Sequence, residues 1–385
     1  MRHTQRVVFC LFFILLVSCQ NKEGKENSIG YSIKWNDKSL VCIAEEGAYP
    51  RMRRLNDSSL LVVYENRQGN VLSKRSFDEG ILWSEENVVY ESFLYEDEKQ
   101  EQSTKVNIFN PELIQLDNGD LLFACNLRPE KNEVFPFSIA LKRSTDNGYT
   151  WEKEQVIYEA HPRFNDGCWE PSFLALPDGT LHLYFANEYP YTESNEQEIS
   201  MLFSNDNGMT WTQEATTVSF RRNHRDGMPV AILDGKNIVM AIEDNISGQF
   251  FHPYIISGDV QDNWASPVSG SSPNRWNALA SPLSKDVYGG APYLIKTDSG
   301  LYVLSYQTTR NRTNNWENST MEVVISEMTN NFDNPTYPFN VSLNKEAKWN
   351  SLTDLGKGEI AALASTNFQS EKIGVWMIKG QIFKK

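Results

Sequence analysis

The sequence is poor in cysteine and histidine. Five of each occur among 385 residues. Cys42, Cys125 and Cys168 follow the first 19 residues without C-x-x-C spacing, which argues against a zinc site or a disulfide framework and leaves at most one disulfide. The histidines lack ligand spacing with one another. We therefore expect no metal cluster and no cofactor. The spacing of the cysteines and histidines makes no prediction about a calcium ion, which would be held by other side chains.

Cationic side chains are also scarce. The chain has 36 Lys and Arg against 50 Asp and Glu, a formal net charge of −14, and loss of Arg2 and Arg6 with residues 1–18 makes this −16. Such acidity argues against a nucleic-acid partner and weakly against polyanionic substrates.

The apolar run of residues 7–17 is too short and too early for a spanning helix, and with Arg2 and Arg6 before it the run predicts a signal peptide. Residues 16–19, LVSC, resemble a bacterial lipobox, which implies cleavage after residue 18 and lipidation of Cys19. An ordinary secretory signal with a chance cysteine is the alternative. Residues 20–30 are polar and predict a flexible tether. We expect a bacterial cell-envelope protein that meets the membrane through its lipid alone.

A repeat with a period near 60 residues fills residues 31–385. Its clearest copy, residues 166–188, predicts a hairpin with two apolar runs around a Pro-Asp-Gly turn. The first apolar residues after each turn are Leu60, Leu121, Leu181, Ile238, Leu301 and Ile360, at spacings of 61, 60, 57, 63 and 59. Each copy has two further strand-like runs, for example residues 137–142 and 155–158. This pattern predicts an all-β, six-bladed β-propeller with four antiparallel strands per blade.

A second motif has the same period. Residues 144–151 and 204–211 match S-x-D-x-G-x-T-W, residues 76–83 match it with Leu82 for Thr, and residues 257–264 are a degraded copy. Asp and Ser side chains bond such a turn's own backbone and Gly takes the positive φ, so we expect a structural turn without a catalytic role. The motif is similar to the Asp-box (BNR repeat) of sialidase-like β-propellers. A strand near residues 31–35 should join the last blade, whose strands include residues 374–378, and close the ring.

Residues just before each inner strand of a propeller face a common central funnel. Here they are residues 49–51, 110–112, 169–171, 226–228, 290–292 and 349–350. Among them, Glu170 lies between Trp169 and Pro171. A carboxylate beside a large apolar face has a raised pKa and suits a general acid. A channel glutamate paired with an arginine is the alternative.

A second carboxylate is expected from Glu243, which ends the second strand of the fourth copy, one blade on from Glu170. Glu65 holds the same repeat position in the first copy, and Glu188 lies slightly beyond it in the third. Carboxyls about 5 Å apart make a retaining glycosidase, and about 6.5–9.5 Å an inverting one. The sequence does not give the spacing.

Short motifs around these glutamates suggest a family. True sialidases carry an Arg-Ile-Pro motif. If Pro50 is aligned with the proline of that motif, Ala48 takes the place of the arginine. Arg51 or Arg53 could supply the missing arginine after a register shift. The motifs WEP (169–171) and RDGMP (225–229), together with Glu243, instead resemble glycoside hydrolase family 93. The resemblance implies a retaining exo-α-1,5-L-arabinanase with Glu170 as acid/base and Glu243 as nucleophile, or with the two roles exchanged.

Seven residues are predicted to contact the substrate: Tyr49, Arg51, Trp169, His224, Arg225, Asp226 and Tyr288. The aromatic members suit stacking on sugar rings or simple packing, and His224, Arg225 and Asp226 suit sugar hydroxyls. For His224, a position in a surface loop is the favoured interpretation. Arg51 and Arg53 would be needed only by an anionic sugar.

We therefore expect a monomeric, lipid-anchored, exo-acting glycoside hydrolase that cleaves α-L-arabinofuranosyl linkages in an oligosaccharide or polysaccharide of the arabinan type. One alternative is an exo-α-sialidase or another glycosidase acting on an anionic sugar. A second is a non-catalytic carbohydrate-binding propeller, and a third is a protein-binding scaffold without convergent acids.

Overall fold

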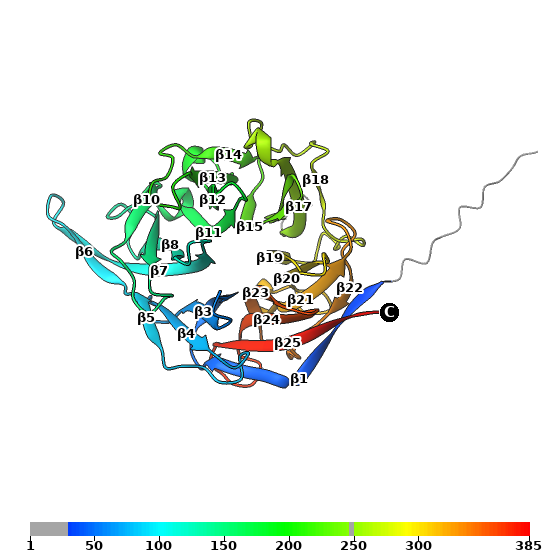
Figure 1. Cartoon of the computed structure of the whole chain (residues 1–385). Helices are drawn as coiled ribbons and strands as arrows, with labels where there is room; N and C mark the ends of the chain where they lie inside the picture. The colour runs from blue at the N-terminus through cyan, green and yellow to red at the C-terminus, as the bar shows by residue number, and fades with distance from the viewer. Residues whose placement is uncertain (1–29, 246–249) are drawn as a thin grey trace, which may run out of the picture.

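The computed structural model describes residues 30–245 and 250–385, and these form six antiparallel sheets around a central axis (Figure 1). The predicted six-bladed β-propeller is therefore confirmed. The predicted signal peptide (residues 1–18), the predicted lipidation site Cys19 and the tether up to residue 29 lie outside the described residues. Within the described ranges, no helix has the length and apolar composition needed to cross a bilayer.

Each blade begins with its innermost strand. Blade 1 consists of β2 (Ala48–Arg54), β3 (Leu60–Glu65), β4 (Val71–Ser76) and β5 (Asn87–Tyr90). Blade 2 consists of β7 (Gln102–Gln115), β8 (Leu121–Pro129), β9 (Ser138–Ser144) and β10 (Gln155–Glu159), with β6 (Phe93–Asp97) added beside β7. Blade 3 consists of β11 (Cys168–Ala175), β12 (Leu181–Asn187), β13 (Glu198–Ser204) and β14 (Thr216–Ser219).

The remaining three blades repeat this order. Blade 4 consists of β15 (Asp226–Asp234), β16 (Asn237–Asp244), β17 (His252–Asp259) and β18 (Arg275–Asn277). Blade 5 consists of β19 (Gly289–Lys296), β20 (Tyr302–Thr308), β21 (Thr320–Ser326) and β22 (Asp333–Thr336). Blade 6 consists of β23 (Ala347–Gly356), β24 (Glu359–Thr366), β25 (Gly374–Lys384) and β1 (Tyr31–Ala44). Short 3-10 helices span Phe164–Asp166, Tyr189–Tyr191, Val260–Asp262 and Trp316–Asn318.

The N-terminal strand closes the ring, as predicted. Strand β1 lies antiparallel to β25, with Tyr31 opposite Lys384 and Trp35 opposite Gly380. Figure 1 shows these two ends of the chain side by side in the last blade. Because the first and last segments share one sheet, the ring cannot open without breaking their hydrogen bonds.

The second strand of a blade is buried on both faces because each sheet stacks between two others. All seven residues of β12 are buried. One apolar cluster joins Leu122 of blade 2, Phe185 of blade 3 and Met240 of blade 4. A continuous apolar run is the sequence pattern of such a strand, which explains why the hairpins were predictable.

One feature of blade 2 was not predicted. Strand β7 is 14 residues long, and its first half pairs with β6 while its second half pairs with β8. The resulting hairpin projects from the ring beside blade 2, in cyan in Figure 1.

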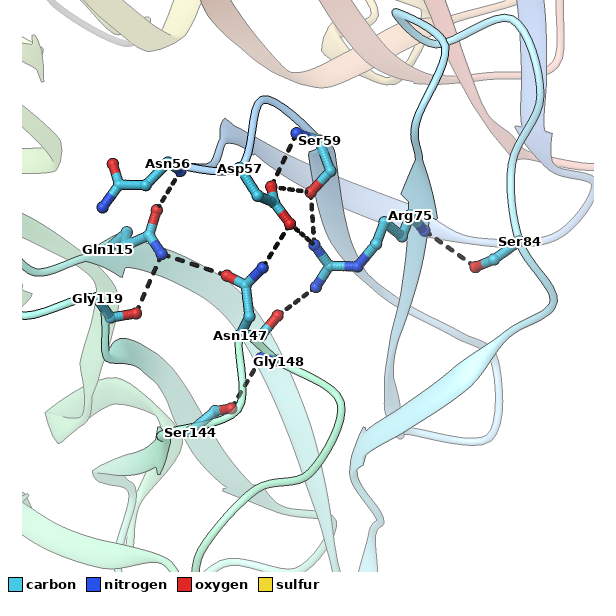
Figure 2. Close-up of polar contacts among 10 residues, drawn as sticks. All are labelled: Asn56, Asp57, Ser59, Arg75, Ser84, Gln115, Gly119, Ser144, Asn147 and Gly148. Atoms are coloured by element: carbon cyan, nitrogen blue, oxygen red, sulfur yellow. Dashed lines mark hydrogen bonds and ion pairs between the residues drawn. The ribbon is translucent and has the colours of Figure 1, made fainter.

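The Asp-box turns hold neighbouring blades together. The Asn147 side chain, in the turn after β9, donates to Asp57 Oδ2 of blade 1 at 2.7 Å and accepts from Gln115 Nε2 at 3.2 Å (Figure 2). Arg75 of β4 donates to the carbonyl of Asn147 and to Ser59 Oγ. Within the turn, Asp146 accepts from the Thr150 N–H at 2.9 Å. The expected structural role is confirmed.

Candidate functional site

All six inner strands carry the same irregularity near their start. A β-bulge interrupts each inner pair. The bulged residues have a positive φ of 48–54° and are Tyr49, Asn110, Glu170, Met228, Ala291 and Trp349. Bulges of this kind change the direction of a side chain and are frequent beside active sites. Here they sit at the positions predicted to face the funnel.

Side chains from the preceding blade clamp these bulges. In five cases the backbone N–H of the bulged residue donates to the side chain of Ser365, Glu65, Asn126, Glu243 or Gln307. These acceptors lie at or near the end of the second strand of their blades, so the repeat supplies a clamp at five of the six junctions. Two of the five acceptors are glutamates. Each of them uses one carboxyl oxygen to hold the bulge and has its second oxygen left for another partner.

A cavity of about 430 Å³ opens at the bulges. Five predicted site residues line it: Tyr49, Trp169, Glu170, Arg225 and Glu243. Its lining also includes Glu65, Asn110, Arg128, Glu188, Gln197 and Trp349. The structure thus brings Glu170 and Glu243 into one cavity.

A larger groove, of about 810 Å³, lies between the outer strands of blades 2 and 3. Glu159 and Glu214 line it as exposed side chains, and its buried carboxylate, Glu198, accepts hydrogen bonds from Tyr191, Ser200 and Thr217. Since that carboxylate is already bonded, the central cavity is the better candidate for chemistry.

The pKa of Glu170 is raised to about 8. Burial is the main cause, the negative charge of Glu243 adds to it, and Arg128 opposes both. No hydrogen bond from the described residues reaches the Glu170 carboxyl. Glu170 is therefore protonated at neutral pH, the state a general acid needs.

The pKa of Glu243 is raised to about 7, chiefly by burial, while the Ala291 N–H and Arg225 oppose the rise. The Ala291 N–H donates to Glu243 Oε2 at 2.8 Å. A Cβ on Gly290 would lie 2.7 Å from Oε2, and one on Gly227 would lie 3.0 Å from Oε1. Glycine at these two positions makes room for the carboxylate.

These raised pKa values predict a pH-dependent stability. A carboxyl whose pKa is higher in the native state stabilises the fold below its unfolded pKa, near 4.5, and that contribution is lost as pH rises through about 8. We expect Glu170→Gln to match the wild type at pH 4 and to exceed it at pH 9, by up to a few kcal/mol. Thermal unfolding at both pH values tests this.

The matched control is Glu98→Gln, at an exposed glutamate. This variant should follow the wild type at both pH values. Equal melting temperatures of Glu170→Gln and wild type at pH 9 would contradict the raised pKa.

Arg225 lines the cavity and is bonded to neighbouring polar groups. Its guanidinium donates to Glu188 Oε1 and to Gln197 Oε1, and its Nη1 donates to the Asn195 carbonyl at 3.2 Å. Glu188 Oε2 is buried and accepts no hydrogen bond from the described residues. This group of charges lies near both Glu170 and Glu243, and Arg225 lowers the pKa of each.

Asp226 does not have its predicted role in binding sugar. It is fully buried, and its carboxylate accepts from Arg275 and from Ser219 Oγ at 2.7 Å. Arg275 also pairs with Asp244, which Arg221 contacts at 2.8 Å. Asp226 therefore belongs to a buried ion-pair network inside blade 4.

Arg51 is also wrongly predicted as a substrate ligand. It is 3% exposed, stacks 4.0 Å from the centre of the Tyr49 ring, and lies 3.5 Å from Glu112. Arg53 donates to Glu112 and to Tyr293. Both cations suggested for an anionic sugar are therefore committed to protein groups.

Tyr288 and His224 do not line the cavity. The Tyr288 hydroxyl accepts from Gln307 Nε2 at 2.9 Å, and its ring packs against Phe250 and Trp316, so it is not an open stacking platform. His224 is half-buried in the loop before β15. Tyr49 and Trp169 line the cavity but are 4% and 7% exposed, so they act mainly as its walls.

The sequence reasoning missed Arg128 and left Glu65 and Asn110 without a role. Glu65 had a signal, since it shares the repeat position of Glu243. Asn110 occupies a funnel position. Arg128 lies near the end of β8, two residues beyond the repeat position that Glu65 and Glu243 share, so that position does not mark it.

The described residues contain no group of three or more His, Cys, Asp and Glu side chains placed to hold a metal ion. Cys42, Cys125 and Cys168 are free thiols.

Comparisons with known proteins agree with this fold. The model of a family described as a BNR repeat-like domain matches residues 137–316. A sialidase from Micromonospora viridifaciens is 31% identical over 121 residues, which cover 28% of this chain and 19% of that protein. The match therefore spans about a fifth of that relative's length.

Solved structures give the same picture over most of the chain. The α-L-arabinofuranosidase Arb93A from Fusarium graminearum, a mutant bound to an iminosugar inhibitor, superposes with a TM-score of 0.66 at 16% identity, covering 89% of this chain and 97% of that one. The α-L-arabinanase from Penicillium chrysogenum with arabinobiose gives 0.61 at 17%, covering 90% and 97%. The NanB sialidase from Streptococcus pneumoniae gives 0.60 at 12%, covering 91% and 70%. The chain thus has the sialidase-like propeller fold.

Proposed function

We propose that this protein is a retaining, exo-acting glycoside hydrolase that uses Glu170 and Glu243 to cleave α-L-arabinofuranosyl linkages of an arabinan-type polysaccharide. The supporting observation is that two carboxyl groups from neighbouring blades share one cavity and differ in their bonding. Glu170 accepts no hydrogen bond from the described residues and has the higher pKa, whereas Glu243 accepts a backbone N–H. A bond to the charged form favours ionisation, so Glu170 suits the acid and Glu243 the nucleophile.

The reaction then has two steps. A Glu243 oxygen attacks the anomeric carbon while Glu170 gives its proton to the departing glycosidic oxygen. Water, deprotonated by Glu170, next attacks the same carbon and releases Glu243 as a carboxylate. Each step returns Glu170 to the form that the next step needs.

The choice of sugar rests on two lines of support. Two of the superposed proteins are named for action on arabinose linkages. Arg51 and Arg53, which an anionic sugar would require, are paired with Glu112. We also propose that Cys19 carries a lipid that anchors the domain to the bacterial cell envelope, as the lipobox-like residues 16–19 indicate.

The test is hydrolysis by the full chain, solubilised in detergent, of linear α-1,5-arabinan, sialosides and uronides. We expect release of short products from arabinan, with the anomeric configuration retained by NMR. Cleavage of sialosides without cleavage of arabinan would reject the assigned sugar. Binding of arabinan without any hydrolysis would support the carbohydrate-binding alternative instead.

A further inference from the structure

Arg128 is a cation without a polar partner at the wall of the central cavity. Among the described residues, no hydrogen bond or ion pair reaches its guanidinium. Aromatic rings hold it in place instead, since it lies 4.9 Å from the ring centre of Trp169, 5.1 Å from that of Phe109 and 5.7 Å from that of Phe164. A guanidinium has five N–H donors, and here they are left for water or a ligand.

Acceptor groups line the same cavity. Asn110 is 7% exposed, and its Oδ1 is buried without a hydrogen-bond partner. Glu65 Oε2 accepts from the Asn110 N–H at 3.1 Å, and no described residue bonds its Oε1. All three residues line the cavity, with Arg128 near both Glu65 and Glu170. An orphaned acceptor beside orphaned donors is costly unless a ligand or water completes the set.

We propose that Arg128, Glu65 and Asn110 form a second sugar subsite that binds vicinal hydroxyls of a neutral sugar unit adjoining the scissile bond. The proposal rests on the proposed glycosidase function and adds a specificity requirement to it. Substrates with a second sugar unit gain these contacts, and substrates with one sugar unit and an apolar leaving group do not.

The mixture of groups favours a neutral ligand. A hydroxyl both accepts and donates, so a diol can accept from Arg128 while donating to Glu65 and Asn110. A carboxylate only accepts, and it would meet the amide oxygen of Asn110 and the carboxyl of Glu65 as further acceptors. Arg128 is the one charged group of this subsite that would favour a carboxylate, so a neutral diol fits the subsite better.

The experiment compares two substrates on the full chain and on two variants. Arg128→Met keeps a long side chain between the aromatic rings and removes the donors. Asn110→Gly removes the amide while keeping a residue that accepts the φ of 51°. We expect kcat/KM on α-1,5-arabinotriose to fall about 10- to 100-fold in each variant. On 4-nitrophenyl α-L-arabinofuranoside, the loss of kcat/KM should be at least fivefold smaller in each variant, because the aryl group makes no such hydrogen bonds.

Equal losses on both substrates, or no loss on either, would overturn the subsite while leaving the glycosidase intact. If the wild type cleaves neither substrate, the proposed function fails, and calorimetric titration with arabinobiose and with a digalacturonide then tests the subsite alone. The subsite is supported if Arg128→Met weakens the binding of arabinobiose at least tenfold. Tighter binding of the digalacturonide, or arabinobiose binding that is absent or unaffected by the substitution, overturns it.

Discussion

Replacing Glu170 or Glu243 with alanine is expected to lower kcat on arabinan-type substrates by about 10³-fold or more. Glu170→Ala removes the proton donor for the departing oxygen, and Glu243→Ala removes the group that attacks the anomeric carbon. Neither variant should melt far below the wild type at pH 8, because each substitution removes a carboxyl whose burial opposes ionisation, and in Glu243→Ala this gain offsets the lost bond to the Ala291 N–H. Steady-state kinetics together with thermal unfolding measures both effects.

Glu65→Ala is the matched control for Glu243→Ala. Glu65 clamps the Asn110 N–H as Glu243 clamps the Ala291 N–H, so both variants lose the same structural contact. Because Glu65 is not assigned to the reacting bond, its loss should reduce kcat at least tenfold less. A reduction by Glu65→Ala as large as that by Glu243→Ala would show that the clamp, and not a nucleophile, is what the substitution removes.

Arg275→Met is expected to cause the largest loss of stability, about 3–5 kcal/mol in the free energy of unfolding. The substitution leaves Asp226 buried without its arginine and removes one partner of Asp244. Breaking a buried pair from one side costs more than the pair contributes, because the remaining charge cannot reach water. Urea unfolding at pH 7 measures the change.

Arg54→Met provides the comparison. Arg54 pairs with Glu79 at the surface, where 28% and 48% of the two side chains are exposed. An exposed pair contributes below about 1 kcal/mol. If both substitutions cost the same, the blade 4 network does not have the structural role assigned to it.

Much of the fold could be predicted from the sequence because the repeat is local. The apolar hairpins and the Asp-boxes recur every 60 residues or so, and each repeat specifies one blade. The bulges could not be predicted, although they occur six times. In five of them the residue before a proline has a positive φ, whereas such residues usually prefer extended conformations. In four of these five, a side chain of the neighbouring blade accepts a hydrogen bond from the backbone N–H of that residue and supports the conformation.

The role of a site residue could be predicted where its position in the repeat determines that role. It could not be predicted where the role depends on a partner far away in the sequence. Glu170 could be predicted from its position facing the funnel, and Glu243 from its position at the end of a second strand. Asp226 was misassigned because its partner Arg275 lies 49 residues later, in a segment that departs from the repeat. Arg51 likewise meets Glu112 of the next blade. Such pairings exist only after the blades have packed.

The most direct test of the paired-glutamate mechanism is azide rescue of the two alanine variants on 4-nitrophenyl α-L-arabinofuranoside, with the product identified by NMR. Glu170→Ala should yield the α-azide, because azide opens the covalent intermediate formed on Glu243. Glu243→Ala should yield the β-azide, because azide attacks the substrate directly from the face that Glu243 occupied. The same anomer from both variants, or no rescue of either, would contradict the assignment of Glu170 and Glu243.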